Sequence, residues 1–267
     1  MTLTREGDRL LAHAQGILSL HDEAIADLTG KGLSGVIRFG CPNEYAYSFL
    51  SNLIDEFVSH HPDVLIEVVC APTPRLHERL NKHAIELALV SIIDGATAER
   101  SIRIEPLVWI AKSAATLKIE PLPLALSDPD GLDHINARLG LDAQNRRYRV
   151  AYASGSLTGL LSVVRSGQAL AVLKRSAVPT DLRIFGPQYN LPPLPALGIA
   201  IAFDRARPSA LVTAFADHIR AVLPKIQQTC SERESSRLST PLVQAADNPG
   251  RRYRCTALKT RDRPARR

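Results

Sequence analysis

Two short turns carry the side chains best suited to chemistry, and each directly follows a run typical of a β-strand. The first reads Pro42-Asn43-Glu44-Tyr45 and the second Ser154-Gly155-Ser156-Leu157. A run with helical periodicity follows each turn, so backbone N–H groups without a partner and the positive end of a helix dipole are expected there. Such turns bind carboxylates and similar anions. Two facing turns would hold one small organic anion from both sides.

The same residues also have a purely structural explanation. Asn43, Ser154 and Ser156 are of the types favoured as helix N-caps, which contribute about 1 kcal/mol each without any ligand. The two roles are compatible, because a capping side chain can also face a cleft. The predicted ligand site therefore joins both turns with nearby side chains that could add polar or apolar contact. It comprises Pro42, Asn43, Glu44, Tyr45, Ser91, Tyr152, Ser154, Gly155, Ser156, Leu157 and Phe203.

The other reactive side chains do not form a catalytic or metal-binding motif. Residues 155–159 read GSLTG, which lacks the central serine of a G-x-S-x-G nucleophile turn, and glycine-rich phosphate loops are missing from the sequence. His60 and His61 are adjacent, so their side chains diverge on a helix and do not suggest a zinc site. The sequence therefore predicts a protein that is not an enzyme and that has no cofactor and no metal.

Four cysteines, Cys41, Cys70, Cys230 and Cys255, show neither a C-x-x-C pair nor metal-ligand spacing, which fits a reducing compartment. Cys41 and Cys70 end two predicted strands that the fold would place side by side. Their thiols could then lie close enough to form a redox pair. Small buried cysteines are the commoner case, and both interpretations stay open here.

The two turns lie in a body in which strands alternate with helices. Strands are expected at residues 36–40, 64–70, 87–91, 102–111, 123–126, 149–153, 169–173 and 197–203, and helices at 43–61, 74–82, 129–139, 156–165 and 208–223. This alternation predicts a parallel sheet with both faces covered. The pattern restarts near residue 123, which indicates two α/β lobes. The proline-rich residues 191–195 would return the chain to the first lobe and leave a cleft between the two.

The two ends of the chain differ from this body. Residues 3–28 have the period of an amphipathic helix, whose apolar face should pair with a second copy in a homodimer or homotetramer. Residues 225–267 hold eleven Lys and Arg against four Asp and Glu, which leaves the body close to neutral although the whole chain carries +6. This tail should be disordered and could contact nucleic acid only weakly and without sequence preference. The predicted dimerisation residues are Leu10, Leu11, Ala14, Ile17, Leu18, Ile25 and Leu28.

Segments spread along the chain resemble, in order, the LysR-type transcriptional regulators from their linker helix onward. They read LTREGDRLLAHAQGILSL (3–20), GVIRFG (35–40), FVSHHPDVLIEV (57–68), ELALV (86–90) and LVWIA (107–111), and residues 151–173 resemble the second lobe of the effector-binding domain of that family. The resemblance covers about residues 3–224. It implies an α/β, two-lobed type 2 periplasmic-binding-protein-like fold, a dimeric linker helix and a small-molecule effector.

The resemblance also implies a domain organisation. Residues 1–32 would be the linker helix, 33–224 the effector-binding domain, and 225–267 the tail. Lobe I would span about 33–115 and 195–224, and lobe II about 116–194. The N-terminal winged helix-turn-helix of the family is missing, so we expect a truncated product or a start codon placed too late. Promoter DNA would be bound only through that domain.

Two other classes of protein share such a fold. A solute-binding protein of a transporter would need an export signal or a lipid anchor, and the acid-containing amphipathic N-terminus resembles neither. An enzyme would need a convergent acid, base or nucleophile. An apolar run of the roughly 18 residues that span a membrane is also missing. The sequence therefore predicts a cytoplasmic regulatory domain that does not contact the membrane, with the solute-binding protein as the main alternative.

Overall fold

The computed structural model describes residues 33–93, 101–204 and 208–226, together with ten positions of the N-terminal segment. These ten are Thr4, Glu6, Gly7, Leu10, Ala14, Gly16, Ile17, Leu18, His21 and Ile25. All described residues belong to one compact unit, which spans residues 1–230. Within the described residues no helix is long and apolar enough to cross a membrane.

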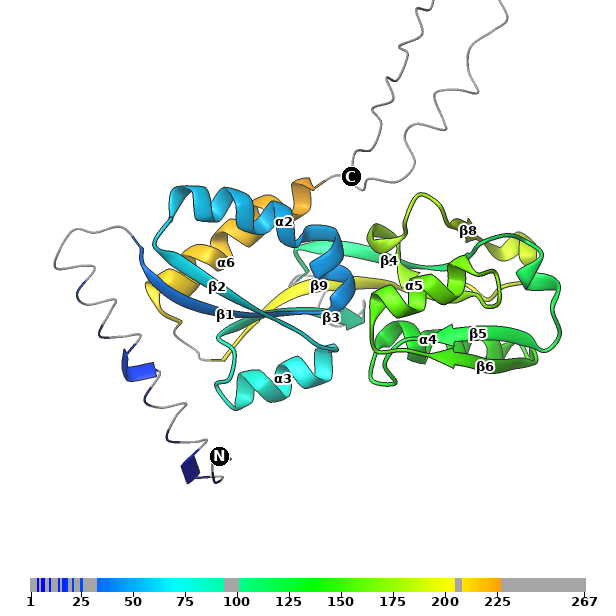
Figure 1. Ribbon diagram of the computed structural model, residues 1–267, viewed down its shortest axis with the longest axis horizontal. Helices are drawn as coiled ribbons and strands as arrows, with labels where there is room; N and C mark the ends of the chain where they lie inside the picture. Colours follow the sequence, from blue (N-terminus) through cyan, green and yellow to red (C-terminus); the bar gives the residue numbers. More distant parts are fainter. Residues whose placement is uncertain are drawn as a thin grey trace, which may run out of the picture. The chain divides into compact units, whose positions relative to one another are not determined.

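Lobe I is a sheet with helices on both faces (Figure 1). Its strands are β1 (Gly35–Cys41), β2 (Val64–Cys70), β3 (Leu87–Ile93) and β9 (Ala196–Phe203), in the order β2-β1-β3-β9. Helices α2 (Asn43–His60) and α6 (Ala210–Val222) cover one face, and α3 (Thr73–Asn81) covers the other. A single turn, η5 (Leu223–Lys225), follows α6.

Lobe II holds the remaining strands and helices. Strand β4 (Arg103–Ala111) pairs with β7 (Ala171–Lys174) and β8 (Arg183–Phe185), while β5 (Leu122–Leu126) pairs with β6 (Tyr148–Ala153). Helices α4 (Leu132–Ala143) and α5 (Leu157–Arg165) pack on these strands, and three short turns complete the lobe: η2 (Thr116–Lys118), η3 (Arg175–Ala177) and η4 (Pro187–Tyr189). The strand β8 was not predicted from the sequence.

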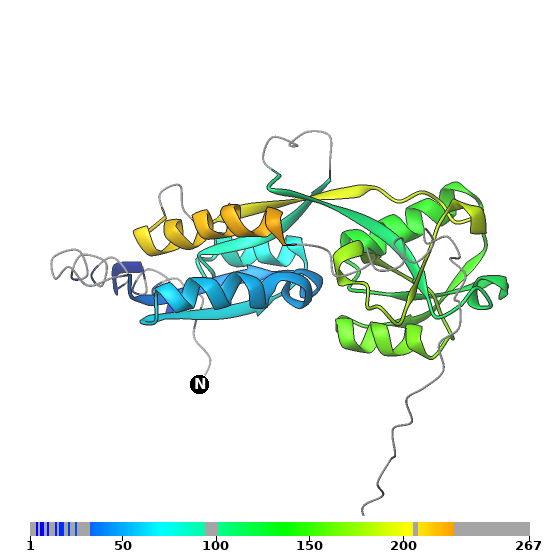
Figure 2. The same ribbon diagram turned by 90° about the horizontal axis from the view of Figure 1, so that it is seen from above.

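The predicted parallel arrangement is confirmed for the first three strands of lobe I and does not extend to the strands that connect the lobes. Strands β1, β2 and β3 are parallel to one another, but β9 is antiparallel to both β3 and β4. The reason is that the chain re-enters lobe I from lobe II, so β9 runs against the direction of β3. Strand β4 crosses between the lobes itself, since residues 103–106 pair with β9 and residues 107–111 pair with β7 and β8 (Figure 2).

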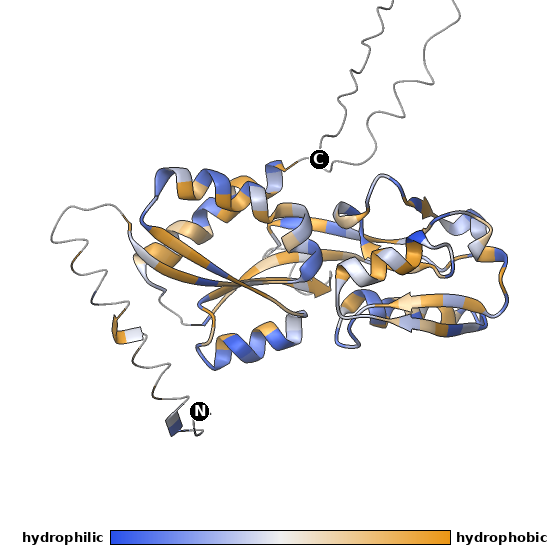
Figure 3. Ribbon diagram, in the orientation of Figure 1, coloured by the Kyte–Doolittle hydropathy of each residue, from blue (hydrophilic) through white to orange (hydrophobic). Residues whose placement is uncertain are grey.

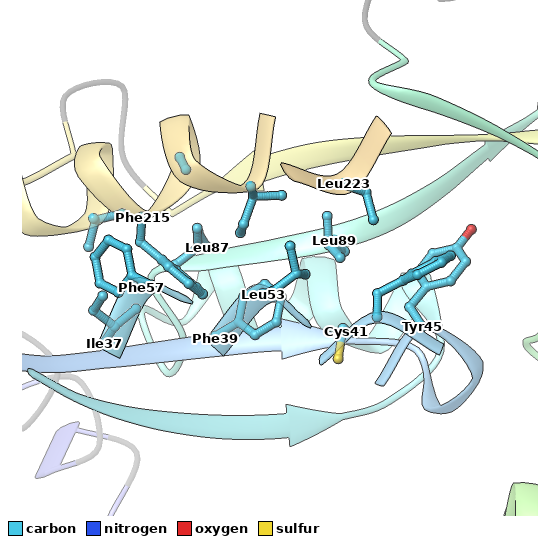
Figure 4. Close-up of a cluster of buried hydrophobic side chains, with 14 of the residues drawn as sticks. Ile37, Phe39, Cys41, Tyr45, Leu53, Phe57, Leu87, Leu89, Phe215 and Leu223 are labelled. Atoms are coloured by element: carbon cyan, nitrogen blue, oxygen red, sulfur yellow. The ribbon is translucent and has the colours of Figure 1, made fainter. Parts of the chain in front are cut away.

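The apolar pattern of α2 explains how lobe I folds. Phe49, Leu53 and Phe57 recur every four residues, so they share one face of the helix and are almost fully buried against the sheet. Phe215 of α6 meets Phe57 and Phe39 edge-on, with ring centroids 4.9 Å and 5.5 Å away (Figure 4). The strands of lobe I are mostly hydrophobic, whereas α3 is mostly hydrophilic (Figure 3). This packing fixes the start of α2 beside the carboxyl end of β1.

The described positions of the N-terminal segment agree with the predicted helix. Nine of them are helical, from Glu6 to Ile25. The side chains of Leu10, Ile17, Leu18 and Ile25 are exposed, and that of Ala14 is half-buried. Leu11 and Leu28, which complete the predicted dimerisation face, lie outside the described residues, as do residues 227–267 of the predicted tail.

Candidate functional site

One pocket lies between the two lobes, and all of the helices α2, α3, α4 and α5 begin at it. Each of these helices directly follows a strand, so the strand–turn–helix connections of both lobes meet there. The first N–H groups of a helix have no partner inside the helix and point along its positive end. The pocket therefore combines four helix starts, two from each lobe. Its lining comprises Pro42, Asn43, Glu44, Pro72, Thr73, Ser91, Ser127, Asp128, Asp130, Gly131, Leu132, Asp133, Ser154, Gly155, Ser156, Leu157, Leu160 and Lys174.

Three charged side chains of this lining, Glu44, Asp133 and Lys174, are buried. Lys174, at the end of β7, places its Nζ 3.3 Å from Oε1 of Glu44 in the first turn of α2. Asp133, in the first turn of α4, is the third member. The Lys174 ammonium also lies 5.1 Å from the centre of the Tyr45 ring. This cluster of one basic and two acidic side chains therefore connects β7 and α4 of lobe II to α2 of lobe I.

Burial and mutual attraction oppose one another in this cluster. Burial lowers the pKa of Lys174, but the carboxylates of Glu44 and Asp133 outweigh it and hold that pKa above its usual value. Burial raises the pKa of the Asp133 carboxyl; the charge of Glu44 adds to this effect, and Lys174 opposes it. Lys174 is therefore a fixed cation, already neutralised by its two neighbours.

Polar contacts across the pocket hold the lobes together. Arg75 of α3 places Nη2 3.2 Å from Oδ2 of Asp128 and Nε 3.2 Å from Oδ2 of Asp130, both on the loop before α4. Asn43 donates a hydrogen bond from Nδ2 to the Gly155 carbonyl at 3.2 Å. The structure therefore has its lobes in contact, and the free volume of the pocket is about 50 Å³.

The serines of the second turn have distinct roles. Ser156 is the N-cap of α5, since its Oγ accepts a hydrogen bond from the Gly159 N–H. Ser154 shapes the turn, because its Oγ accepts a bond from the Ser156 N–H at 3.2 Å. A Cβ at Gly159 would lie only 2.6 Å from Ser154 Oγ, so a larger residue there would force the Ser154 hydroxyl to move. Asn43, by contrast, is not an N-cap: Pro42 occupies that position of α2, and the Asn43 side chain reaches the other lobe instead.

The structure brings most, but not all, of the predicted effector-site residues to the pocket. Eight of them line it: Pro42, Asn43, Glu44, Ser91, Ser154, Gly155, Ser156 and Leu157. Tyr45 lies behind the lining, where its buried hydroxyl shares a 2.8 Å hydrogen bond with Ser91 Oγ. Burial raises the pKa of this phenol to about 12, although Lys174 and the Ser91 hydrogen bond act in the opposite direction.

Tyr152 and Phe203 do not line the pocket. Phe203 ends β9 and pairs with Leu87 at the start of β3, whereas the pocket lies near Ser91, at the other end of that strand. Tyr152 lies on β6 with its side chain largely exposed.

Sequence reasoning missed the contribution of α3 and α4. Thr73 accepts a hydrogen bond from the Ser91 N–H at 3.0 Å, and Asp128 and Asp133 flank the start of α4. The rule that singled out the first two turns would have found both, because residues 71–73 and 127–131 also lie between a strand and a helix. Lys174 gave no local signal, since a lysine at the end of a strand is ordinary. Among the described residues no group of His, Cys, Asp and Glu could hold a metal ion.

Comparison with known proteins decides the family. Residues 30–224 match the model of the LysR substrate binding domain. The chain belongs to the LysR family of transcriptional regulators. It is 56% identical, over 227 residues, to the HTH-type transcriptional regulator DgdR of Burkholderia cepacia, which corresponds to 85% of this chain and 77% of that relative. The predicted regulatory class is therefore confirmed, and the transporter alternative is set aside.

Solved structures of regulatory domains share the fold at low sequence identity. The CcmR regulatory domain of Synechocystis PCC6803, in complex with 2-PG, matches with a TM-score of 0.56 and 16% identity over 71% of this chain and 97% of that one. The reduced form of the regulatory domain of OxyR2 from Vibrio vulnificus matches with a TM-score of 0.54 and 13% identity, over 71% and 96%. The predicted periplasmic-binding-protein-like α/β fold is confirmed.

Proposed function

We propose that the pocket between the lobes is the effector site of this LysR-family regulator, and that its ligand is a small organic anion. The observation that carries the proposal is the meeting of four helix starts, from both lobes, at a single pocket. Helix starts offer backbone N–H donors and positive potential to a carboxylate. The hydroxyls of Thr73, Ser154 and Ser156 add side-chain hydrogen bonding.

The charges of the lining refine the class of ligand. Glu44, Asp128, Asp130 and Asp133 bring four carboxylates, whereas Lys174 is the one basic side chain among the lining residues and is already paired. A ligand with negative charge alone would meet repulsion from these groups. The proposed effector therefore carries a second, hydrogen-bond-donating or cationic group that faces the aspartates while its carboxylate contacts the helix starts.

Ligand binding would act on the position of the lobes. The pocket is small, about 50 Å³, and Arg75 and Asn43 contact the opposite lobe across it. A larger ligand can enter only when these contacts open, and the bound ligand then replaces them with its own. Effector occupancy would thus be read as a change in the angle between the lobes, which is the signal a regulator needs.

The whole protein is proposed to act as a cytoplasmic homodimer or homotetramer. The exposed apolar side chains of the N-terminal segment, together with the family assignment, support self-association through residues 1–32. Promoter DNA would be bound through a winged helix-turn-helix domain, and the description of the DgdR relative as an HTH-type regulator supports this part of the proposal.

Calorimetry on serine variants tests the effector site. A thermal-shift screen of small carboxylic, hydroxy and amino acids would identify a ligand. Ser154→Ala and Ser156→Ala should then each weaken binding about five- to a hundredfold, because a hydrogen bond to a charged group contributes about 1 to 3 kcal/mol. Ser162→Ala is the matched control, since Ser162 lies on the same helix and bonds only to the Thr158 carbonyl. Unchanged affinity in both pocket variants would place the ligand elsewhere.

A further inference from the structure

Cys41 and Cys70 end two neighbouring strands at the same level. Strands β1 and β2 are parallel, and their register pairs Cys41 directly with Cys70. Adjacent strands are about 4.8 Å apart, which lies within the ~4.4 to 6.8 Å between Cα atoms that a disulfide spans. Directly paired residues also direct their side chains to the same face of a sheet. The spacing and direction of the two residues therefore meet the backbone criterion for a disulfide.

The two thiols differ sharply in their surroundings. Cys41 is buried beside Tyr45 (Figure 4), whereas Cys70 is exposed. The neighbouring Cys41 thiol lowers the pKa of Cys70 to about 7, while burial and the charge of Glu44 act in the opposite direction. The Cys70 thiol, together with burial, raises the pKa of Cys41. Cys70 is therefore more readily ionised at neutral pH than an ordinary cysteine.

We propose that Cys41 and Cys70 are a redox-active pair that closes into an intramolecular disulfide when the protein meets a peroxide. The exposed Cys70 thiolate attacks one peroxide oxygen, forms a sulfenic acid and releases hydroxide. The Cys41 sulfur then attacks the Cys70 sulfur; the sulfenic hydroxide leaves and takes the Cys41 proton as water. Two thiols are thereby oxidised by two electrons, and one peroxide is reduced to two waters. A low-molecular-weight thiol reverses the step.

The position of the pair gives this bond a route to the pocket. Cys41 immediately precedes Pro42, and Cys70 lies two residues before Pro72, so both cysteines lead into turns that line the pocket. Ala71 already donates its N–H to the Cys41 carbonyl at 3.2 Å, which couples the two turns. Closing the disulfide would fix the starts of α2 and α3 relative to each other. This consequence rests on the proposed effector function of the pocket.

Peptide mass analysis tests the disulfide in the full chain. Cys230 and Cys255 are replaced by serine; the reduced protein is then treated with hydrogen peroxide, blocked with N-ethylmaleimide and digested with trypsin. Residues 39–74 contain neither Lys nor Arg, so both cysteines stay on one peptide. We expect this peptide to lose two hydrogens and to carry no maleimide. Two maleimides on the peptide, a disulfide between chains, or irreversible oxidation of Cys70 alone would overturn the proposal.

Single variants separate the two roles. Cys41→Ser should leave Cys70 as a sulfenic acid that dimedone traps, and Cys70→Ser should leave Cys41 unmodified because it is buried. Reaction of both single variants at equal rates would contradict the assigned order of attack. We also expect the Kd of a ligand found by screening to change at least about fivefold between the reduced and the oxidised protein. If the disulfide closes and the Kd is unchanged, the disulfide does not affect the pocket. If the screen finds no ligand, that result counts against the effector site, and the mass analysis alone decides on the disulfide.

Discussion

The Lys174 ammonium and the Glu44 carboxylate lie 3.3 Å apart and join the end of β7 in lobe II to the first turn of α2 in lobe I. Both side chains are buried, and Asp133 adds a second carboxylate nearby. Removing charges from water is costly, so such a cluster contributes little net stability as a whole, but the loss of one member leaves the others uncompensated. The stability of the pocket therefore depends on the single cation of the cluster, Lys174.

Replacing Lys174 by methionine should destabilise the protein by about 3 to 5 kcal/mol at pH 7, because two buried carboxylates lose their cation. Urea unfolding measures this change. The pKa of Asp133 is already raised by burial, and the loss of Lys174 raises it further. The folded state then binds a proton more tightly than the unfolded state, so stability falls as pH rises through the raised pKa and returns toward pH 4.

Two further variants control this prediction. Lys118→Met removes an exposed lysine of the same lobe and should change the free energy of unfolding by less than about 0.5 kcal/mol. Asp133→Asn, added to Lys174→Met, should restore part of the stability at pH 7, because it removes one of the two unpaired charges. A loss in Lys174→Met that is the same at pH 4 and pH 7 would mean that lost packing, rather than charge, is responsible.

The ion pairs of Arg75 with Asp128 and Asp130 should hold the lobes together without adding much stability. Arg75 is half-exposed, so its pairs contribute at most about 1 kcal/mol to folding. Arg75→Gln should instead shift the lobes toward separation, which small-angle X-ray scattering detects as a larger radius of gyration of the ligand-free protein. Arg165→Gln is the matched control, since it breaks the Arg165–Asp181 pair within lobe II at similar exposure. Equal scattering from both variants would show that Arg75 does not control closure.

The sequence predicted those elements whose residue pattern is local, and it did not predict features that depend on distant parts of the chain. The stripe Phe49, Leu53 and Phe57 gave α2 directly, and the β-branched run at residues 64–70 gave β2 with its observed limits. The direction of β9 could not be predicted in that way, because it depends on which end of lobe I the chain re-enters. The sequence therefore did not reveal that Phe203 lies at the end of β9 away from the pocket.

In the candidate site, too, local features could be predicted from the sequence and contacts between the lobes could not. The sequence predicted a cap at Ser154 or Ser156, and the structure has it at Ser156, because a cap depends only on residues three positions apart. The partner of Asn43 is the Gly155 carbonyl, 112 positions further along the chain, and the partner of Lys174 is Glu44. Contacts between lobes have no periodicity in the sequence. The two turns could therefore be recognised from the sequence, whereas the cluster of Glu44, Asp133 and Lys174 could be found only in the structure.

Self-association through the N-terminal segment makes the last prediction. Ile17 and Leu18 are helical, with 68% and 61% of their surface exposed, which is far more than an apolar side chain in a core would show. Apolar surface of this kind is covered when a second copy packs against it. The wild-type chain should therefore be a dimer or tetramer by light scattering at tens of micromolar. Ile17→Asp with Leu18→Asp should weaken association at least about tenfold, since burying two unpaired carboxylates at a helix interface is strongly unfavourable.

The matched control for that pair is Leu139→Asp. Leu139 lies on α4 of lobe II and is also 61% exposed, but it is not part of the N-terminal segment. This variant should keep the wild-type molecular mass, and all variants should keep the circular dichroism and urea midpoint of the lobes. A monomeric wild-type chain would refute self-association outright. Dissociation by Leu139→Asp, with no effect of the N-terminal pair, would assign the interface to lobe II, because in that case the apolar face of residues 1–32 would not be what the second copy covers.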